Sequence, residues 1–281
     1  MLSASDSALI ARAVELIDQA DALVIAAGAG MGIDSGLPDF RGNQGFWQAY
    51  PALAHAKLEF HSVAAPYTFR VNPTLAWGFY GHRLQLYRET MPHAGFALLK
   101  AWGERMAHGY GIYTSNVDGQ FQKAGFDPQR VYECHGSIHH LQCMEPCGPH
   151  IWRADDFQPQ VDANACRLRS EAPVCPHCGG MARPNILMFS DWEWNEQRAQ
   201  VQEARLLEWL RTTRRPLVIE IGAGTAIPSV RHFSNRVVMQ HGGRLIRINP
   251  DECRVARPED DVGLPLGALE ALTAIAALLP A

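Results

Sequence analysis

Short apolar runs alternate with segments of helical periodicity along most of the chain. The apolar runs lie at residues 22–27, 111–114, 130–133, 216–221 and 244–248. Each run has the length of a strand that is buried on both faces. Between the runs, apolar residues recur every three or four positions in segments near 9–20, 73–90, 94–106, 195–212 and 230–240. This alternation predicts an α/β fold, a Rossmann-like, doubly wound parallel sheet.

Two segments interrupt the alternation. Residues 43–90 read as a loop followed by a helix, and residues 141–183 are rich in cysteine, proline and glycine with little periodicity. We therefore expect the smaller parts to be a cofactor loop with a helical insertion at 43–90 and a metal-binding module at 141–183. The Rossmann-like domain is then expected to comprise residues 1–42, 91–140 and 184–281.

Composition and charge narrow the class of protein. The chain has 281 residues, of which 47% are hydrophobic and 19% charged, enough for one sizeable core and a smaller satellite. A net charge of −4 without a long basic run argues against a nucleic-acid partner. A small-molecule or protein partner fits better.

The two ends of the chain and its cysteines bear on location. The first residues lack the basic region of a secretory signal, and the apolar stretch 264–281 contains two prolines and a glutamate. This stretch predicts a docked helix and no membrane contact. Seven cysteines, an odd number, favour a reducing compartment over a disulfide framework. We expect a cytoplasmic protein, and the sequence makes no prediction of its oligomeric state.

A glycine-rich turn follows the first apolar run. Gly28, Gly30 and Gly32 allow the backbone to turn tightly and its amides to approach a phosphate. The spacing departs from the G-x-G-x-x-G fingerprint, because Ile33 stands at its last position. The segment therefore predicts either a nucleotide site or a simple turn.

Polar side chains follow the next two runs. Asn116 and Asp118 come directly after the run at 111–114, where an amide and a carboxylate can bind a carboxamide or ribose hydroxyls. His135 follows the run at 130–133, at the neighbouring strand end, where an imidazole can serve as a general base near neutral pH. A structural histidine is the alternative when this residue is considered alone.

Two cysteine pairs lie within the second interruption. The pairs are Cys143 with Cys147 and Cys175 with Cys178. Four thiolates at tetrahedral corners close a structural zinc site with no open position. Iron in the same site and unliganded cysteines are alternatives, and the rival ligands are Cys166, His150 and His177. Acidic residues balance the positive charge of the arginines in this module, which argues against binding of nucleic acid by the module.

Taken in order, these motifs resemble the sirtuins, the Sir2 family of NAD-dependent protein deacylases. The matching segments are residues 28–41 (GAGMGIDSGLPDFR, family G-A-G-x-S-x-x-S-G-I-P-x-F-R), 114–118 (TSNVD, family T-Q-N-I-D), 135–136 (H-G), 183–191 (RPNILMFSD, family R-P-x-V-V-x-F-G-E), 222–224 (GAG, family G-T-S) and 248–249 (I-N). The cysteine pairs stand where the family's zinc module begins.

The resemblance implies that NAD lies across the carboxyl edge of the sheet and that an acyl-lysine protein or peptide enters opposite. The catalytic residues it implies are His135, Asn116 and Asp118. The cofactor-binding residues are Gly28, Ala29, Gly30, Ile33, Asp34, Phe40, Arg41, Ser115, Asn116, Asp118, Gly222, Ala223, Gly224 and Asn249. The substrate strand contributes Ile186, Met188 and Phe189.

The resemblance also implies a role for several side chains. His135 removes a proton from the ribose hydroxyls, which lets the acyl group pass to ADP-ribose after nicotinamide has left. Asn116 holds the nicotinamide ribose, and Asp118 binds the carboxamide together with the Ile33 backbone. Phe40 shields nicotinamide, and Arg41 orders the cofactor loop. The cysteines hold structural zinc.

Tyr80 and Arg83 bear on the acyl group. They lie three residues apart on one face of the helix that begins at Pro73. The pair resembles the Y-x-x-R of the desuccinylase-type branch of the family, which implies malonyl, succinyl or glutaryl lysine as substrate. Packing and a salt bridge at the surface are the alternative.

The chain departs from the family pattern at several positions that face the cofactor or the peptide. These positions are Gly32, Ser115, Ala223, Gly224 and the pair Ser190 and Asp191. They keep two other functions open. One is an NAD glycohydrolase or mono-ADP-ribosyltransferase that uses the same site, and the other is a non-catalytic scaffold.

Overall fold

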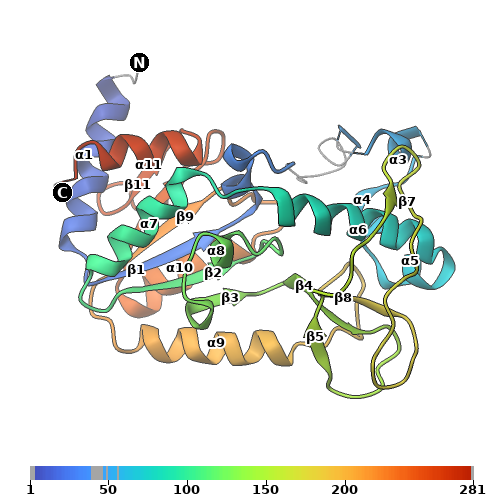
Figure 1. The fold of residues 1–281 in the computed structure, drawn as a ribbon. Coiled ribbons are helices and arrows are strands. Elements are labelled where there is room, and N and C mark those ends of the chain that lie inside the picture. The colour runs from blue at the N-terminus through green and yellow to red at the C-terminus, as the bar shows by residue number, and fades with distance from the viewer. Residues whose placement is uncertain (1–3, 39–46, 49, 56, 280–281) are drawn as a thin grey trace.

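A six-stranded sheet forms the centre of the molecule (Figure 1). The computed structural model describes residues 4–38, 47–48, 50–55 and 57–279. The strand order is β11-β10-β9-β1-β2-β3, and every neighbouring pair is parallel. The strands are β1 (Ala22–Ala27), β2 (Tyr110–Thr114), β3 (Val131–Glu133), β9 (Pro216–Ile221), β10 (Arg244–Ile248) and β11 (Val262–Leu264). The predicted Rossmann-like fold is confirmed.

Helices cover both faces of this sheet (Figure 1). The first face is covered by α1 (Ala4–Gln19), α7 (Ala94–Arg105) and α11 (Ala268–Ala276), and the second by α9 (Gln197–Leu210) and α10 (Ser229–His241). Because side chains alternate along a strand, Leu23 and Ile25 pack in the first core while Val24 and Ala26 pack in the second. This two-sided burial explains the continuous apolar run of β1.

The register brings the carboxyl ends of the strands to one edge. Ala27 of β1 lies opposite Thr114 of β2 and Ile221 of β9. The outer strands end at the same level, with Glu133 opposite Thr114 and Ile248 opposite Ile221. The residues that follow five of these strands therefore start from the same edge.

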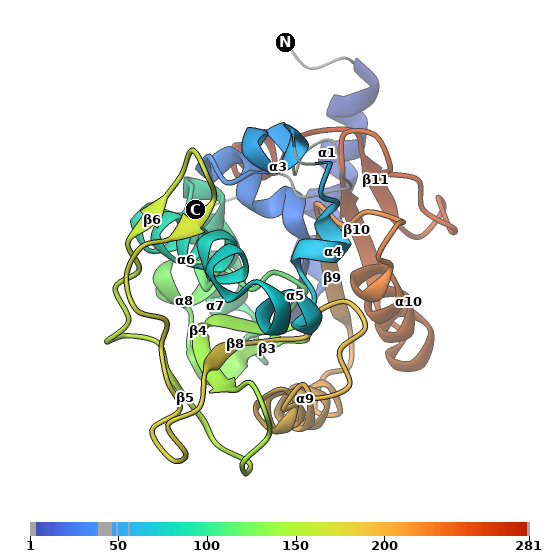
Figure 2. The same ribbon diagram turned by 90° about the vertical axis from the view of Figure 1, so that its right-hand side faces the viewer.

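A smaller part of the molecule lies beside this edge (Figure 2). A three-stranded antiparallel sheet has the order β5-β4-β8, and a two-stranded sheet pairs β6 with β7. Their bounds are β4 (Gly136–Cys143), β5 (Ile151–Arg153), β6 (Val161–Asp162), β7 (Arg167–Leu168) and β8 (Ala182–Ile186). The neighbouring helices are α3 (Pro51–His55), α4 (Phe60–Val63), α5 (Pro66–Val71) and α6 (Pro73–Glu89).

The helices and the small sheets share one core. Trp77 of α6 is buried and donates from Nε1 to the carbonyl oxygen of Ala182 at 3.1 Å. A Cβ on Gly78 would lie 2.3 Å from the carbonyl oxygen of Cys166, so α6 packs directly on the backbone of the module. The two interruptions of the sequence pattern are therefore neighbours in space.

The element bounds differ from the sequence pattern mainly in these insertions. In the described part of segment 43–90, α3, α4 and α5 precede α6, and each of them is too short to show a periodicity of its own. Strands β4 to β7 were not predicted either, because β4 contains a register shift and β5 to β7 have two or three residues. The stretch 264–281 supplies the docked helix α11. Within the described ranges, no helix has the length and apolar character needed to cross a membrane.

Candidate active site

Two glycine turns meet at the carboxyl edge. The Gly28 amide donates to the Ile221 carbonyl at 2.9 Å, and the Gly30 amide donates to the Gly222 carbonyl at 3.0 Å. A Cβ on Gly28 would lie 2.7 Å from the Gly222 oxygen, and Gly222 itself has a positive φ of 62°. The glycines therefore serve the close approach of two turns. Because the amides of Gly28 and Gly30 are already bonded, a phosphate would meet other amides here.

The 3₁₀ helix η1 (Ala29–Ser35) follows the first turn. The side chain of Ile33 is 43% exposed. Asp34 accepts a hydrogen bond from the Leu269 amide at 2.8 Å, so its carboxylate caps the start of α11. This gives Asp34 a structural partner in addition to its predicted place near the cofactor. Phe40 and Arg41 lie outside the described residues.

Asn116 lies in the loop after β2 and faces the first glycine turn. Its Nδ2 donates to the Gly28 carbonyl at 2.9 Å, and its own amide donates to Thr114 Oγ1 at 3.0 Å. The Ser115 amide donates to the Ala27 carbonyl at 3.1 Å, which continues the pairing of β1 with β2. These bonds fix the loop against the turn.

Asp118 is a buried carboxylic acid in the same loop. Its side chain accepts a hydrogen bond from the Gln120 amide at 2.9 Å, at the start of α8 (Gln120–Lys123). His139 of β4 donates from Nε2 to the Asp118 carbonyl at 2.8 Å. Burial raises the pKa of Asp118 to about 6, because water no longer solvates the charged form. The carboxylate is therefore ionised at neutral pH and titrates just below it.

His135 lies at the adjacent strand end, between β3 and β4. Burial lowers the pKa of His135, because water no longer solvates the charged form, so the neutral imidazole predominates at pH 7. Nε2 lies 3.4 Å from Oγ of Ser229. Gly136 follows with a φ of 80°, and a Cβ there would lie 2.1 Å from the Asn185 oxygen. A glycine is therefore required after His135, because the backbones of β4 and β8 approach closely where these strands pair.

The end of β8 and the residues after it were expected to bind the substrate peptide. Ile186 and Met188 are buried and Phe189 is half-buried. The amides of residues 187, 188 and 189 donate to the His135 carbonyl, Asp191 and the Ala64 carbonyl. The expected strand pairing with a peptide would therefore use carbonyl groups here, because these three donors are taken.

A buried ion pair shapes this segment. Arg183 and Asp191 are joined by hydrogen bonds of 2.6 and 2.9 Å, and both side chains are 0% exposed. Asp191 also accepts from the amide of Glu193 at 3.1 Å. Ser190, directly before Asp191, adopts a φ of 54° at a position where the family pattern has glycine. The departure at 190 therefore places a non-glycine residue in the left-handed region.

Tyr80 and Arg83 are both buried on α6, with exposed fractions of 1% and 8%. Arg83 donates from Nε and a terminal nitrogen to the hydroxyl of Tyr87, at 3.0 and 2.5 Å. Its guanidinium carbon lies 5.2 Å from the ring centroid of Phe79 and 5.9 Å from that of Tyr80. The pair is therefore internal, which removes the surface alternative. Sequence reasoning missed Tyr87, although its spacing of four from Arg83 marks one helix face.

Asn249 follows β10 and is buried. Its Oδ1 accepts hydrogen bonds from the amides of Asp251 and Glu252 at 3.0 and 2.9 Å. Its Nδ2 donates to the Ala223 carbonyl at 3.0 Å. Asn249 therefore holds the loop that carries Ala223 and Gly224, and both lone pairs of Oδ1 are already engaged.

The four predicted cysteines form one cluster. Their sulfur atoms lie within 4.8 Å of one another, and they form the metal-type cluster found in the described part of the chain. The Sγ atoms of Cys143 and Cys178 are 3.5 Å apart, and those of Cys147 and Cys175 are 3.6 Å apart. Tetrahedral zinc with bonds of about 2.3 Å places sulfur atoms roughly 3.8 Å apart, so the cluster fits zinc.

The rival ligands lie outside this cluster. Cys166 is buried where the module backbone meets Gly78. The rings of His150 and His177 stack on each other with centroids 3.6 Å apart. Within the described ranges, the four cysteines form the group whose geometry suits a metal ion, and none of these three residues belongs to it.

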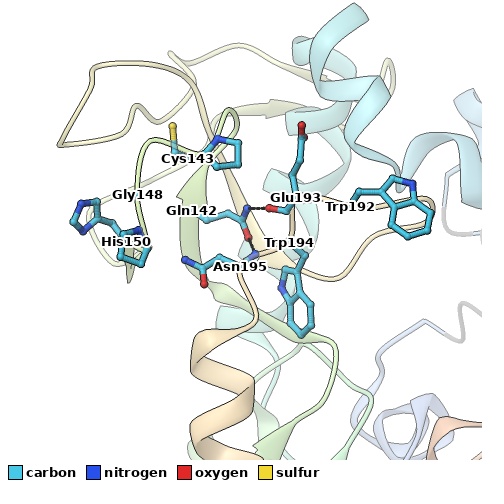
Figure 3. Close-up of a pocket in the computed structure, with 10 residues that line it drawn as sticks. Gln142, Cys143, Gly148, His150, Trp192, Glu193, Trp194 and Asn195 are labelled. Carbon is cyan, nitrogen blue, oxygen red and sulfur yellow. Dashed lines mark hydrogen bonds between the residues drawn. The ribbon is translucent and has the colours of Figure 1, made fainter.

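A cavity of about 280 Å³ lies between the cysteine module and the loop before α9 (Figure 3). Gln142 donates to the Glu193 carbonyl at 2.9 Å and accepts from the Asn195 amide at 3.0 Å, which fixes one wall. Trp192 at its rim is 95% exposed. Of the predicted site residues that the structure describes, only Cys143 lines this cavity, so the cavity is separate from the edge that gathers Asn116 and His135.

Comparisons with known proteins agree with this arrangement. The model of the Sir2 family matches residues 28–211. An NAD-dependent protein deacylase of Aquifex aeolicus is 29% identical over 85% of this chain and 87% of its own length. NAD-dependent protein deacylase 1 of Pseudomonas aeruginosa is 29% identical over 88% of this chain and 90% of its own. A solved Sir2 homolog–NAD complex has a TM-score of 0.71 at 23% identity, covering 95% of this chain and 93% of that one.

Proposed function

The chain belongs to the Sir2 family, and we propose that it is an NAD-dependent protein lysine deacylase. The observation that carries the proposal is the meeting of Asn116, Asp118 and His135 at one sheet edge, beside the turns of Gly28 and Gly222. Relatives that align over most of their length are named NAD-dependent protein deacylases. The acyl acceptor is ADP-ribose, and nicotinamide is released.

The donor set fits NAD. Asp118 offers a buried carboxylate that is ionised above about pH 6, which suits an N–H donor such as a carboxamide. The side-chain amide of Asn116 already lies against the Gly28 turn, where we place the cofactor. When bound, NAD supplies an electrophilic ribose carbon as nicotinamide leaves.

His135 supplies the base. Its lowered pKa keeps the imidazole neutral at pH 7, so Nε2 can take a proton from a ribose hydroxyl. Gly136 and the pairing of β4 with β8 hold the residue in place. The cysteine cluster would hold zinc as a structural ion, because four thiolates leave no coordination position for substrate.

We further propose that the acyl group is acidic. Arg83 places a permanently charged guanidinium inside an aromatic cluster, with Tyr80 and Tyr87 beside it. A carboxylate that reaches this cation gains a charge-assisted hydrogen bond in a site with little water. Malonyl, succinyl and glutaryl lysine carry such a carboxylate, and acetyl lysine does not.

A second candidate is an NAD glycohydrolase or mono-ADP-ribosyltransferase. It is favoured by the amides of residues 187–189, which are engaged within the chain and are not available to a substrate strand. Water or another nucleophile would then attack the same ribose carbon. This candidate predicts nicotinamide release without any acyl peptide.

The test is incubation of the protein with NAD and acetyl-, succinyl- or unmodified lysine peptides, with nicotinamide and deacylated peptide measured separately. We expect equal amounts of both products and dependence on the acyl group. His135→Ala should lose peptide deacylation by a factor of about 10² to 10⁴, while the exposed-residue control His55→Ala should retain it. Acyl-independent nicotinamide release would instead establish the second candidate.

A further inference from the structure

Strand β4 contacts the loop after β2 as well as its two neighbouring strands. The pairing of β4 with β8 shifts its register between Ser137 and Leu141. Within this interval, the Ile138 amide donates to the Val117 carbonyl of the loop at 3.0 Å. Such irregularities redirect side chains and are common beside active sites. The part of β4 that is not paired with β8 therefore lies against the loop that carries Asp118.

His139 lies in the same interval, and its ring contacts the peptide group between Asp118 and Gly119. Nε2 is 2.8 Å from the Asp118 carbonyl oxygen. Because a carbonyl oxygen can only accept, the ring carries a proton on Nε2 and donates it. A Cβ on Gly119 would lie 2.7 Å from ring atom Cδ2, and Gly119 has a positive φ of 71°. The imidazole therefore packs directly on the peptide to which it is bonded.

This peptide belongs to the turn that fixes the Asp118 carboxylate. The Gln120 amide donates to Oδ1 of Asp118 at 2.9 Å, so the carboxylate is bonded across Gly119 to the backbone two residues ahead. The direction of that amide depends on the conformation of the intervening peptide. The hydrogen bond from His139 comes from a different element, β4, and holds this peptide from outside the turn.

We propose that His139 is a positioning residue for Asp118: by holding the peptide between Asp118 and Gly119, its imidazole fixes the carboxylate where it can accept a hydrogen bond from the nicotinamide carboxamide. This inference rests on the proposed function, in which Asp118 is that acceptor. His139 acts through Asp118 and makes no contact with NAD in this role. No proton is transferred, and no bond is formed or broken.

No motif of the sequence marks His139. It stands four residues after His135 and four before Cys143, between the base and the first cysteine of the cluster. The register shift in β4 is a tertiary feature, and it is what brings the ring against the loop after β2. The strand that leads into the cysteine module thereby supplies a contact to the cofactor edge.

The first test measures hydrogen exchange of single amides by nuclear magnetic resonance, in the protein without NAD. In His139→Phe, which keeps a ring but loses the donor, we expect the Gln120 amide to exchange roughly threefold to tenfold faster than in the wild type. His139→Gln retains an N–H donor and should restore slow exchange. The Ser115 amide, which bonds the Ala27 carbonyl, is the internal reference and should not change. An unchanged Gln120 amide in His139→Phe would overturn the inference.

The second test compares the binding of NAD with that of ADP-ribose, which lacks nicotinamide and therefore has no carboxamide for Asp118. In His139→Phe we expect the Kd for NAD to rise roughly threefold to tenfold, the value of one hydrogen bond, and the Kd for ADP-ribose to stay within about twofold of the wild type. His139→Gln should restore the binding of NAD. Titration calorimetry measures both constants.

The control for this test is His140→Phe, at the next position of β4. Nδ1 of His140 has no hydrogen-bond partner among the described groups, so this variant should bind both ligands as the wild type does. Equal weakening of NAD and ADP-ribose in His139→Phe would indicate a general structural defect and would overturn the inference. Unchanged binding of NAD in this variant would overturn it as well.

The two tests also separate this inference from the function on which it rests. If Asp118→Asn binds NAD as tightly as the wild type does, the proposed role of Asp118 fails, and the exchange of the Gln120 amide still decides whether His139 holds this turn. If Asp118→Asn weakens the binding of NAD and His139→Phe changes neither that binding nor the exchange, only the inference fails.

Discussion

Asn116 donates a hydrogen bond from its side-chain amide to the Gly28 carbonyl at 2.9 Å. The bond joins the loop after β2 to the turn after β1, two segments separated by more than eighty residues in the chain. It exists because β1 and β2 are parallel neighbours that end at the same level. This bond therefore holds the Gly28 turn and the loop that carries Asp118 together.

Asn116→Ala should weaken the use of NAD. Without the side-chain amide, the loop loses its bond to the Gly28 turn, and the proposed donor toward the ribose is lost as well. We expect kcat/KM for NAD to fall roughly tenfold, about 1.4 kcal/mol, with the melting temperature within a few degrees of the wild type. The exposed control Gln129→Ala should match the wild type. A normal kcat/KM in Asn116→Ala would contradict this role.

Asp118→Asn should separate function from stability. The folded-state pKa of about 6 is above the ordinary value of 3.8, so the folded state binds more protons than the unfolded state between these values. The ionised carboxylate is therefore a cost to stability at pH 7, which asparagine removes while keeping an acceptor for the Gln120 amide. The variant should melt no lower than the wild type at pH 7.5.

Asp118→Asn should weaken the binding of NAD, although it does not lower the melting temperature. An ionised acceptor is lost in the variant, so we expect the affinity for NAD to fall roughly tenfold to a hundredfold. In the wild type the affinity should decrease as the pH falls through about 6, where the carboxylate becomes protonated. Titration calorimetry from pH 5 to 8 measures this, and a flat profile would exclude Asp118 as the carboxamide acceptor.

Removal of the metal should unfold the cysteine module. Metal analysis should find one zinc per chain, and Cys175→Ser should lose it, because three thiolates no longer close the tetrahedron. We expect the module to become sensitive to protease. Cys253→Ser lies outside the cluster and should keep the full metal content. Iron in place of zinc would appear in the same measurement.

Ser190→Gly should stabilise the protein. A φ of 54° costs a non-glycine residue roughly 1–2 kcal/mol, partly offset by the greater freedom of glycine in the unfolded chain. The net gain is expected to be about 0.5–1 kcal/mol, which raises the melting temperature by about 1–4 °C. Ser190→Ala keeps the strain and should bring no such gain. Equal melting temperatures of the two variants would show that the backbone at 190 is not strained.

Arg83→Met should change the preference for the acyl group. The substitution keeps an unbranched side chain in the aromatic cluster but removes its charge. We expect kcat/KM for a succinyl peptide to fall at least tenfold relative to that for an acetyl peptide. Arg88→Met lies on the same helix and serves as the control, because its guanidinium bonds the Phe157 and Ala154 carbonyls. An unchanged succinyl-to-acetyl ratio would remove the acidic-acyl proposal.

The sequence by itself determined the main sheet and the chemical residues at its edge. Strands such as β1 are buried on both faces, so they read as continuous apolar runs, and the residues that follow them start at a common edge. This is why Asn116, Asp118 and His135 were predictable as neighbours. The cysteine spacing was informative for the same reason, since metal chemistry permits few arrangements.

The tertiary structure alone decided the contacts between segments far apart in the chain. The packing of α6 on Cys166, the engagement of the Gly28 and Gly30 amides and the burial of Arg83 depend on non-local packing, which leaves no periodic pattern. Ser229 reaches His135 for the same reason, through the start of a helix whose place is set by the core. Local sequence thus determined which groups lie at the edge, and packing decided which of them are already bonded and which face one another.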